Sequence, residues 1–386
     1  MVRNYPSARF GFVLIESVIV LKKNDMRRSL KIGFIALLSG VLAVPAIAGN
    51  SDRAGQAGAT ELLINPWARS SGFGSANTAS VRGLEAQYLN VAGLAFTNKT
   101  EVLFSSTQWL VGSGVMINSF GISQKIGEAG VIGLGIMNMS FGEIDITTSD
   151  LPEGGIGTFS PNYLNIGISY AKSFSNSING GITVRVINQS ISNLRASGVA
   201  FDAGISYTTG LGNRDKEKNK DNVSFGISLK NVGPPMKFSG DGLSVRGSVP
   251  GSDNSLTLEY RSAKYEMPSS LNIGVTYHWR DNKLMNRVTG AANFTSNSFS
   301  KDQFSFGAEY SFKDLFMVRG GYVLQFGKGG PDIAASALTG PTAGATVEVG
   351  LGKKGTEKKT KLGIDYSYRH TNPFSGVHSI GVRLAL

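Results

Sequence analysis

Charged residues within strand-like stretches are the side chains of this sequence whose types and spacing could do chemistry. They carry both signs, and we expect each on the polar face of its strand: Arg185, Asp202, Lys230, Glu309, Arg319, Asp365, Arg369 and Arg383. Glu309 and Arg319 fall on neighbouring predicted strands, as do Asp365 and Arg383, which predicts two ion pairs. A buried charge is costly unless it is paired. We therefore interpret these residues as paired charges that brace the interior, with a conducting or substrate path as the alternative.

Catalytic chemistry has little support in the sequence. The chain has three histidines and no cysteine, and His278 has no serine–acid pair near it of the kind that a hydrolase needs. A hydrogen-bonded interior histidine explains it better. Asp145, Asp150 and Glu153 are better explained as solvated loop carboxylates than as a calcium site. We therefore expect a non-enzymatic protein without a catalytic, metal or cofactor site.

The charged residues lie on strands in which apolar and polar residues alternate. In residues 271–279 every second residue is large and apolar, and those between are polar or glycine, a period of two that gives a strand two different faces. The same alternation continues to the last residue. It predicts about fourteen strands, near 100–109, 114–126, 129–143, 161–174, 177–191, 198–210, 221–232, 267–279, 284–297, 302–312, 315–325, 342–351, 360–369 and 376–386.

Aromatic residues and connection lengths favour a transmembrane β-barrel over a soluble sandwich. Aromatic residues cluster at strand ends, as in an interfacial girdle: Tyr277, Trp279, Tyr310, Phe312, Tyr366 and Tyr368. If the first strand runs outward, the long connections near 144–160, 233–266 and 326–341 all lie on the outer side. Long outer loops and short inner turns are typical of bacterial barrels. The fold class is thus all-β, an antiparallel barrel of about fourteen strands in contact with outer-membrane lipid.

The N-terminus reads as an export signal. Arg27, Arg28 and Lys31 precede an apolar run that ends at Ala46-Ile47-Ala48, so residues 1–48 are predicted to be a signal peptide whose true start could be Met26. The alternative is that residues 10–21 belong to a longer anchor. Removal of residues 1–48 lowers the net charge from +11 to +6, and no basic surface with aromatics indicates nucleic-acid binding.

Residues 49–99 do not alternate, and we expect them to form an N-terminal plug inside the barrel of residues 100–386. A barrel of about fourteen strands encloses a lumen that needs filling. The plug contains Asn90-Val91-Ala92-Gly93-Leu94-Ala95. This stretch resembles the Asn-Pro-Ala-Gly-Leu-Ala element that FadL-type fatty-acid transporters carry before the barrel, with Val91 in place of the proline.

Further stretches, in order along the chain, resemble the PorV/PorQ family of the type IX secretion system, a branch of the same superfamily. They are Glu61-Leu62-Leu63-Ile64 with Ala68-Arg69, Leu229-Lys230-Asn231-Val232-Gly233-Pro234, Phe306-Gly307-Ala308-Glu309-Tyr310, Val318-Arg319-Gly320-Gly321-Tyr322 and Asp365-Tyr366-Ser367-Tyr368. The resemblance implies a fourteen-stranded outer-membrane barrel with an N-terminal hatch. For the best-known member it implies a shuttle that binds the C-terminal signal domains of exported proteins at the outer face.

The long outer loops are where a partner would bind. Long loops are often functional, and these contain apolar residues that could form a docking surface: Pro234, Pro235, Met236, Phe238, Leu256, Leu258, Tyr260, Ile333 and Leu338. The expected partners are cargo C-terminal domains or the type IX translocon. Two alternatives stay open: a FadL-like channel that takes up hydrophobic small molecules, with a lipid-like ligand, and a purely structural barrel.

Overall fold

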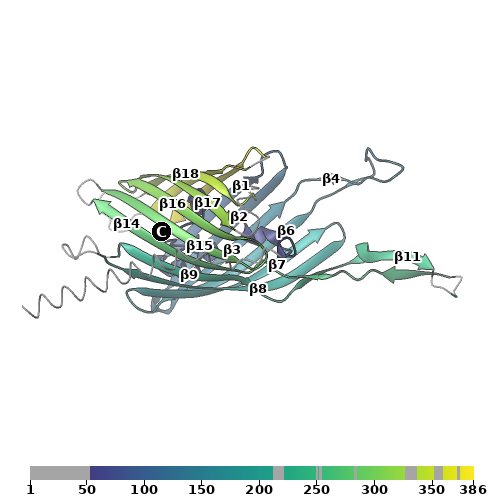
Figure 1. The fold of residues 1–386 in the computed structure, drawn as a ribbon, viewed down its shortest axis with the longest axis horizontal. Helices are drawn as coiled ribbons and strands as arrows, with labels where there is room; N and C mark the ends of the chain where they lie inside the picture. The colour runs from purple at the N-terminus through teal and green to yellow at the C-terminus, as the bar shows by residue number, and fades with distance from the viewer. Residues whose placement is uncertain are drawn as a thin grey trace, which may run out of the picture. The chain divides into compact units, whose positions relative to one another are not determined.

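Fourteen antiparallel strands close into a barrel (Figure 1). The structure is a computed structural model that describes residues 53–211, 221–248, 251, 254–281, 285–326, 337–351, 360–371 and 374–386, so the predicted signal peptide lies outside the described residues. The barrel strands are β1 (Thr100–Trp109), β2 (Val115–Ile126), β3 (Gly130–Ser140), β6 (Asn162–Ser173), β7 (Ile178–Ile191), β8 (Leu194–Thr209), β9 (Val223–Val232), β14 (Ser270–Asp281), β15 (Asn286–Asn297), β16 (Asp302–Phe312), β17 (Phe316–Phe326), β18 (Gly340–Leu351), β19 (Thr360–Arg369) and β20 (Val377–Ala385).

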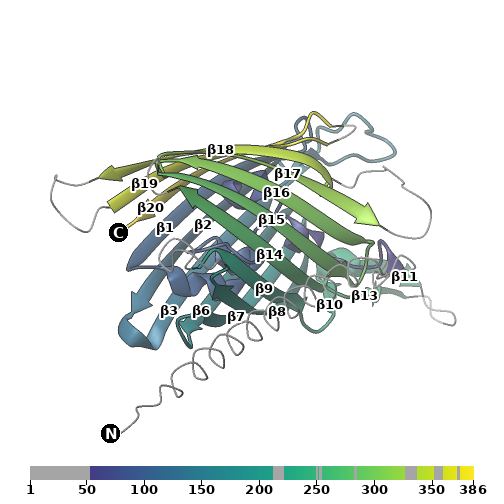
Figure 2. The same cartoon turned by 60° about the vertical axis from the view of Figure 1, so that its left-hand side comes forward.

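The strands follow one another around the barrel in sequence order, as Figure 2 shows for β14 to β20. The last strand pairs with the first, with Val382 opposite Phe104, and β8 pairs with β9. Every strand edge is therefore paired, which a strand in a lipid bilayer requires. The predicted fold class is confirmed.

The two faces of the strands have the reverse polarity of a soluble protein. Large apolar side chains are exposed on the outer face, among them Phe120, Ile168, Ile205 and Ile227. Small polar side chains such as Ser119, Ser169 and Thr183 are buried on the inner face. An apolar exterior around a polar lumen is the arrangement of a barrel in lipid. Within the described residues no helix is long and apolar enough to cross a membrane.

A substitution at Ile380 tests which face of the strands contacts lipid. It lies mid-strand in β20, is 55% exposed and pairs with Ser106 and Tyr366. Ile380→Lys should cost about 2–4 kcal/mol of unfolding free energy, whereas Leu384→Lys, nearer the strand end, should cost about 0–1 kcal/mol. Urea unfolding in liposomes, followed by fluorescence, measures both. Equal losses would contradict the assigned membrane depth.

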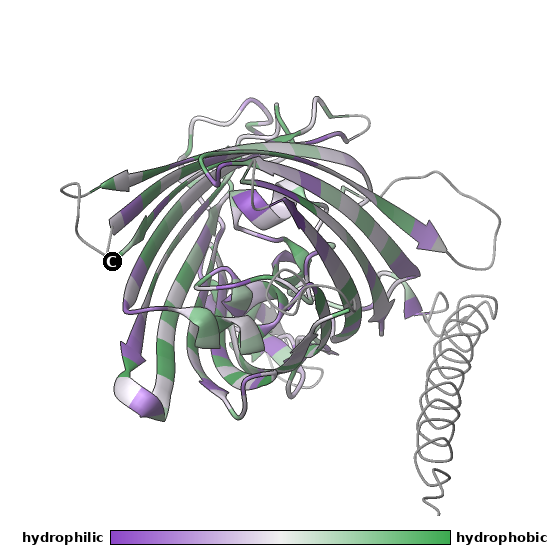
Figure 3. Cartoon of the chain, turned by 90° about the vertical axis from the view of Figure 1, so that its left-hand side faces the viewer, coloured by the Kyte–Doolittle hydropathy of each residue, from purple (hydrophilic) through white to green (hydrophobic). Residues whose placement is uncertain are grey.

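Residues 53–99 form a plug that lies inside the ring of strands, as the view along the barrel shows (Figure 3). Its helices are short: η2 (Thr60–Leu63), α2 (Ala68–Gly72), α3 (Ala86–Leu89) and η3 (Val91–Phe96). Leu84 and Leu94 are fully buried in a cluster that includes Leu103 and Val131 of the barrel wall. Apolar packing between plug and wall therefore stabilises the plug in the lumen.

Glycines on the lumen face let the plug approach the wall closely. A Cβ on Gly226 would lie 2.8 Å from the Cα of Ala79 and from the carbonyl oxygen of Thr78. A Cβ on Gly321 would lie 2.6 Å from the carbonyl carbon of Phe73. Backbone atoms cannot move aside as a flexible side chain can. The glycines of the barrel strands therefore allow the plug backbone to pack directly against the wall.

Hydrogen bonds from the plug to the wall set its orientation. Gln87 Nε2 donates to the carbonyl oxygen of Gly167 (2.8 Å) and to Ser169 Oγ (2.9 Å). Asn90 Nδ2 donates to the carbonyl oxygen of Ile205 (3.1 Å), while its Oδ1 accepts from the Ala92 N–H and caps η3. In both cases the barrel wall supplies acceptors for an amide group of the plug.

The connections differ in length at the two ends of the barrel. At one end the turns are short, such as η4 (Gly127–Ala129) between β2 and β3. At the other end two long loops contain extra strands, β4 (Ile144–Asp145) with β5 (Thr158–Phe159), and β10 (Met236–Ser239), β11 (Ser244–Ser248), β12 (Ser255–Glu259) and β13 (Lys264–Tyr265), with η5 (Asp241–Leu243). Below, the outer end is the end with these long loops, and the inner end is the opposite one.

Candidate functional site

A cavity of about 540 Å³, here called the outer vestibule, lies between the plug and the outer end of the barrel. Its apolar side is formed by Ile64 and Leu89 of the plug and by Trp109, Met139, Phe141 and Tyr163. Its polar side comes from β14 to β17 and the turn after β15, with Ser270, Asn272, Thr295, Asn297, Gln303, Ser305 and Gln325. A cavity of this size with one apolar and one hydrogen-bonding side suits a ligand or a peptide segment.

Within the described residues, three acidic or basic side chains line the outer vestibule. Lys230 is only 6% exposed, and its Nζ lies 3.6 Å from the centre of the Tyr88 ring. Arg369 Nη1 donates to the carbonyl oxygen of Leu338 at 2.8 Å. Glu61 accepts from Gln189 Nε2 at 3.0 and 2.9 Å, and burial raises the pKa of Glu61 to about 7.

The loop between β9 and β14 is partly a wall of the barrel, which corrects the sequence prediction for Met236. We expected this residue on a docking surface, yet it is buried with Ile187 and Ala200 of the barrel and Leu62 of the plug. The reason is that β10 pairs with the outer end of β8, with Phe238 opposite Ala196, and then with β13. This pairing turns Met236 inward.

A hairpin in the same loop projects away from the barrel (Figure 1). In β11 and β12, Val245 lies opposite Leu258 and Gly247 opposite Leu256, so these residues share one face. Val245, Leu256 and Leu258 are all exposed, and Tyr260, which follows β12, is 65% exposed. The hairpin β11–β12 therefore presents an apolar face that no described residue covers.

A second exposed apolar surface lies on the loop of β4 and β5, which sequence reasoning missed. Ile144, Ile146, Leu151 and Ile156 are each exposed. The alternation of Ile144 and Ile146 was a usable signal, since it has the same period of two as the barrel strands.

The remaining predicted loop residues have different environments. Pro234 and Pro235 are exposed. Phe238 is half-buried against Tyr265, with ring centres 5.7 Å apart. Leu338 is half-buried beside the cluster of Ile64 and Trp109, so it lines the vestibule rather than the outer surface. Ile333 lies outside the described residues.

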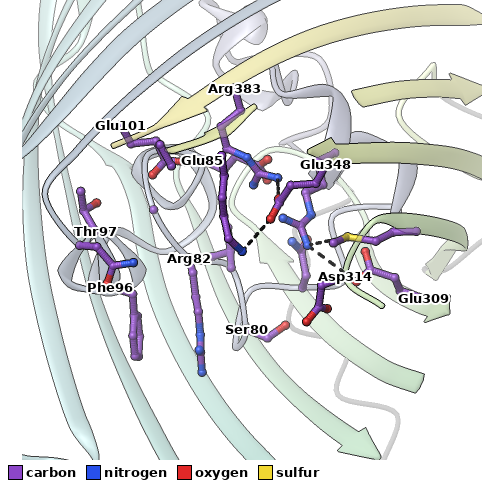
Figure 4. Close-up of a pocket in the computed structure, with 18 of the residues that line it drawn as sticks. Ser80, Arg82, Glu85, Phe96, Thr97, Glu101, Glu309, Asp314, Glu348 and Arg383 are labelled. Carbon is purple, nitrogen blue, oxygen red and sulfur yellow. Dashed lines mark hydrogen bonds and ion pairs between the residues drawn. The ribbon is translucent and has the colours of Figure 1, made fainter. Parts of the chain in front are cut away.

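The inner end of the lumen holds a second cavity, of about 320 Å³, lined by charged residues of plug and barrel (Figure 4). Among the described residues of this cavity, Glu309 is the carboxylate with the most ion-pair partners. It is 3.0 Å from Arg319 Nε, 3.5 Å from Arg287 Nη2 and 3.7 Å from Arg69 Nη2 of the plug. Glu309 and Arg319 lie directly opposite each other on β16 and β17. This network joins the plug to the barrel wall.

Arg383 has a different partner from the one that the sequence suggested. Its Nη2 lies 2.9 Å from Glu348 Oε2, whereas we expected Asp365 (Figure 4). In the register Gly363 stands between them, opposite Arg383 on one side and Glu348 on the other. Because glycine has no side chain, the guanidinium reaches across β19 to Glu348. Asp365 instead accepts a hydrogen bond from Thr346 and lies 4.0 Å from Arg319.

Arg185 and Asp202 form the other buried pair of the predicted set. Arg185 Nη2 lies 2.7 Å from Asp202 Oδ2, and Asp202 Oδ1 accepts from the Asn231 N–H at 2.7 Å. Both carboxylate oxygens are therefore engaged. Sequence reasoning missed Glu101, Arg287 and Glu348, which the parity of their strands could have placed on the lumen face.

A closed barrel with an apolar outer surface, a polar lumen and an internal plug defines a bacterial outer-membrane β-barrel. Within that class, residues 48–246 match the family described as type IX secretion system protein PorV. The chain therefore belongs to the PorV family, which confirms the resemblance seen in the sequence.

Two solved structures from Pseudomonas species are among those similar to this chain. The Pseudomonas putida toluene transporter TodX has a TM-score of 0.48 and 13% identity, covering 80% of this chain and 93% of that chain. A Pseudomonas aeruginosa FadL homologue has a TM-score of 0.43 and 11% identity, covering 83% and 96%. No curated protein matches the sequence.

Proposed function

We propose that the outer end of this barrel binds polypeptide partners of type IX secretion, either the C-terminal signal domains of exported proteins or a subunit of the translocon. The observation that carries the proposal is the hairpin β11–β12, whose apolar face of Val245, Leu256 and Leu258 is exposed. Exposed apolar patches on soluble loops mark interaction sites. Membership of a secretion family supports a polypeptide as the partner.

The anchoring of the loop allows a clean deletion. β10 and β13 pair with each other and hold the loop to the barrel. Removal of residues 240–262 would take away the hairpin and leave these two strands in place. We expect the deleted protein to assemble normally and to lose its polypeptide partners.

Substitutions on the two faces of the hairpin provide the matched test. Leu256→Ser with Leu258→Ser should reduce co-purification of exported proteins or translocon subunits about tenfold or more, because two exposed leucines each contribute roughly 1.5–3 kcal/mol when buried. Ser255→Asn with Thr257→Asn, on the opposite face, should leave it unchanged. Tagged protein is purified from membranes and its partners are quantified by mass spectrometry. Unchanged co-purification in the leucine variant would count against the proposal.

A second candidate function is uptake of hydrophobic small molecules. The apolar side of the outer vestibule, which lies against the plug at Ile64 and Leu89, is the observation in its favour. This function predicts that extraction of the purified protein recovers a lipid-like ligand. Recovery of neither ligand nor polypeptide would leave a structural barrel.

A further inference from the structure

The floor of the outer vestibule holds a buried lysine, Lys230, that forms no ion pair with a described residue. Among the described residues, no carboxylate lies within ion-pair distance of Lys230, and no hydrogen bond involves its Nζ. The face of the Tyr88 ring is the contact that holds the ammonium group. The Tyr88 hydroxyl donates to the carbonyl oxygen of Leu62 at 2.9 Å, which locks the ring in this position.

The carboxylate of Asp202 is already occupied by other partners. Asp202 engages Arg185 with one oxygen and the Asn231 N–H with the other. A cation–ring contact contributes about 0.5–2 kcal/mol, less than the several kcal/mol lost when an ammonium group leaves water. Lys230 and Arg369 both line the vestibule, and the hydrogen bond of Arg369 within the described part of the chain goes to the carbonyl oxygen of Leu338. An anion that enters the vestibule would supply the missing partner.

We infer that the floor of the outer vestibule binds the C-terminal carboxylate of a polypeptide, with the Lys230 ammonium group as its counter-ion. The inference rests on the proposed function, since it names the part of the bound polypeptide that enters the barrel. Arg369 adds positive charge to the same cavity.

The lining and the plug favour a chain end over an acyl chain. The polar side of the vestibule offers amide and hydroxyl groups along β14 to β17, including Asn272, Thr295 and Gln303, which suit the N–H and C=O groups of a peptide. An acyl chain could not hydrogen-bond to this polar side, although the Thr295 hydroxyl already donates to Asn272 Oδ1 at 2.7 Å. Tyr88 and Leu89 of the plug line the inner side of the vestibule. The end of a polypeptide chain fits such a cavity, whereas an internal segment would have to turn back out of it.

The test is a double-mutant cycle with a full-length exported protein that co-purifies with the tagged barrel. On the barrel, Lys230→Met removes the charge and keeps an unbranched side chain over Tyr88, while Lys230→Arg keeps the charge. On the exported protein, a Gly-Ser-Gly extension moves the terminal carboxylate. Affinities are measured by surface interferometry in detergent, and heat-modifiable gel migration confirms that each barrel is folded.

We expect Lys230→Met to weaken binding about tenfold or more, as for a charge-assisted hydrogen bond, and Lys230→Arg to retain most of the affinity. The extension should weaken binding to the wild-type barrel and have no further effect on Lys230→Met, because the two changes break one contact. Additive losses, or full affinity of Lys230→Met, would overturn the inference while leaving the proposed function intact. Absence of any exported protein with the wild-type barrel would overturn both, as would a fatty-acid ligand in the vestibule that is released on Lys230→Met.

Discussion

Replacing Glu309 with glutamine should lower the free energy of unfolding of the barrel by about 3–5 kcal/mol. Glu309 is buried, and its two oxygens face three arginines, with Arg319 Nε at 3.0 Å. The Arg319 side chain has no exposed area, so loss of the Glu309 carboxylate leaves its buried positive charge with only the more distant Asp365, at 4.0 Å, as an acidic neighbour among the described residues. Arg69 of the plug shares the same carboxylate, and we therefore expect the plug to loosen as well.

Lys361 provides the control for this prediction. Its Nζ lies 2.8 Å from Glu348, but its side chain is 56% exposed. An exposed pair contributes about 0–1 kcal/mol, so Lys361→Gln should have a small effect. Urea unfolding in liposomes measures both variants. Similar losses for Glu309→Gln and Lys361→Gln would show that burial does not decide the strength of this network.

Gly321→Val should displace the plug and open the lumen to ions. A Cβ at this position would lie 2.6 Å from the carbonyl carbon and oxygen of Phe73 and 2.8 Å from the Gly74 nitrogen. These are backbone atoms of the plug, and overlap of this kind cannot be relieved by a side-chain rotation. The wall is held by two strand ladders, so the plug should move rather than the strand.

Planar-bilayer recordings measure this effect directly. The wild-type barrel should conduct little, and Gly321→Val should give stable open channels together with protease-sensitive plug residues. Gly290→Val is the matched control, because nothing lies within 4 Å of a Cβ there. A silent Gly321→Val channel would contradict the plug as the barrier across the lumen. An open channel would also remove the floor of the vestibule at which we place Lys230.

Short connections explain which charge pairs were predictable. The turn between β16 and β17 spans three residues, which sets the register and places Glu309 opposite Arg319. Parity along the strands placed both residues on the lumen face, so the pair followed from local sequence alone. The prediction that Asp365 pairs with Arg383 was wrong. The alternation of faces along a strand does not show how far a long side chain extends across the neighbouring strand. Gly363, which has no side chain, let Arg383 pass to Glu348.

Non-local pairing explains the correction at Met236. An apolar residue in a long loop is equally compatible with an exposed docking surface and with a buried contact. The pairing of β10 with β8, which is not adjacent to it in sequence, decides between the two and buries Met236. The exposed leucines of β12, by contrast, pair only within their own hairpin, so the loop residues of one segment have two different roles.

The amino-acid sequence by itself determined the barrel, its strand number and the faces of its strands, because a period of two is a local property that each strand carries independently. The tertiary structure decided where the plug packs and which charged side chains pair with one another. Glu61 meets Gln189, and Asp202 is shared by Arg185 and Asn231, across separations that no local pattern encodes. Among the described residues, Lys230 has no carboxylate at ion-pair distance, because Asp202 is engaged by Arg185 and Asn231.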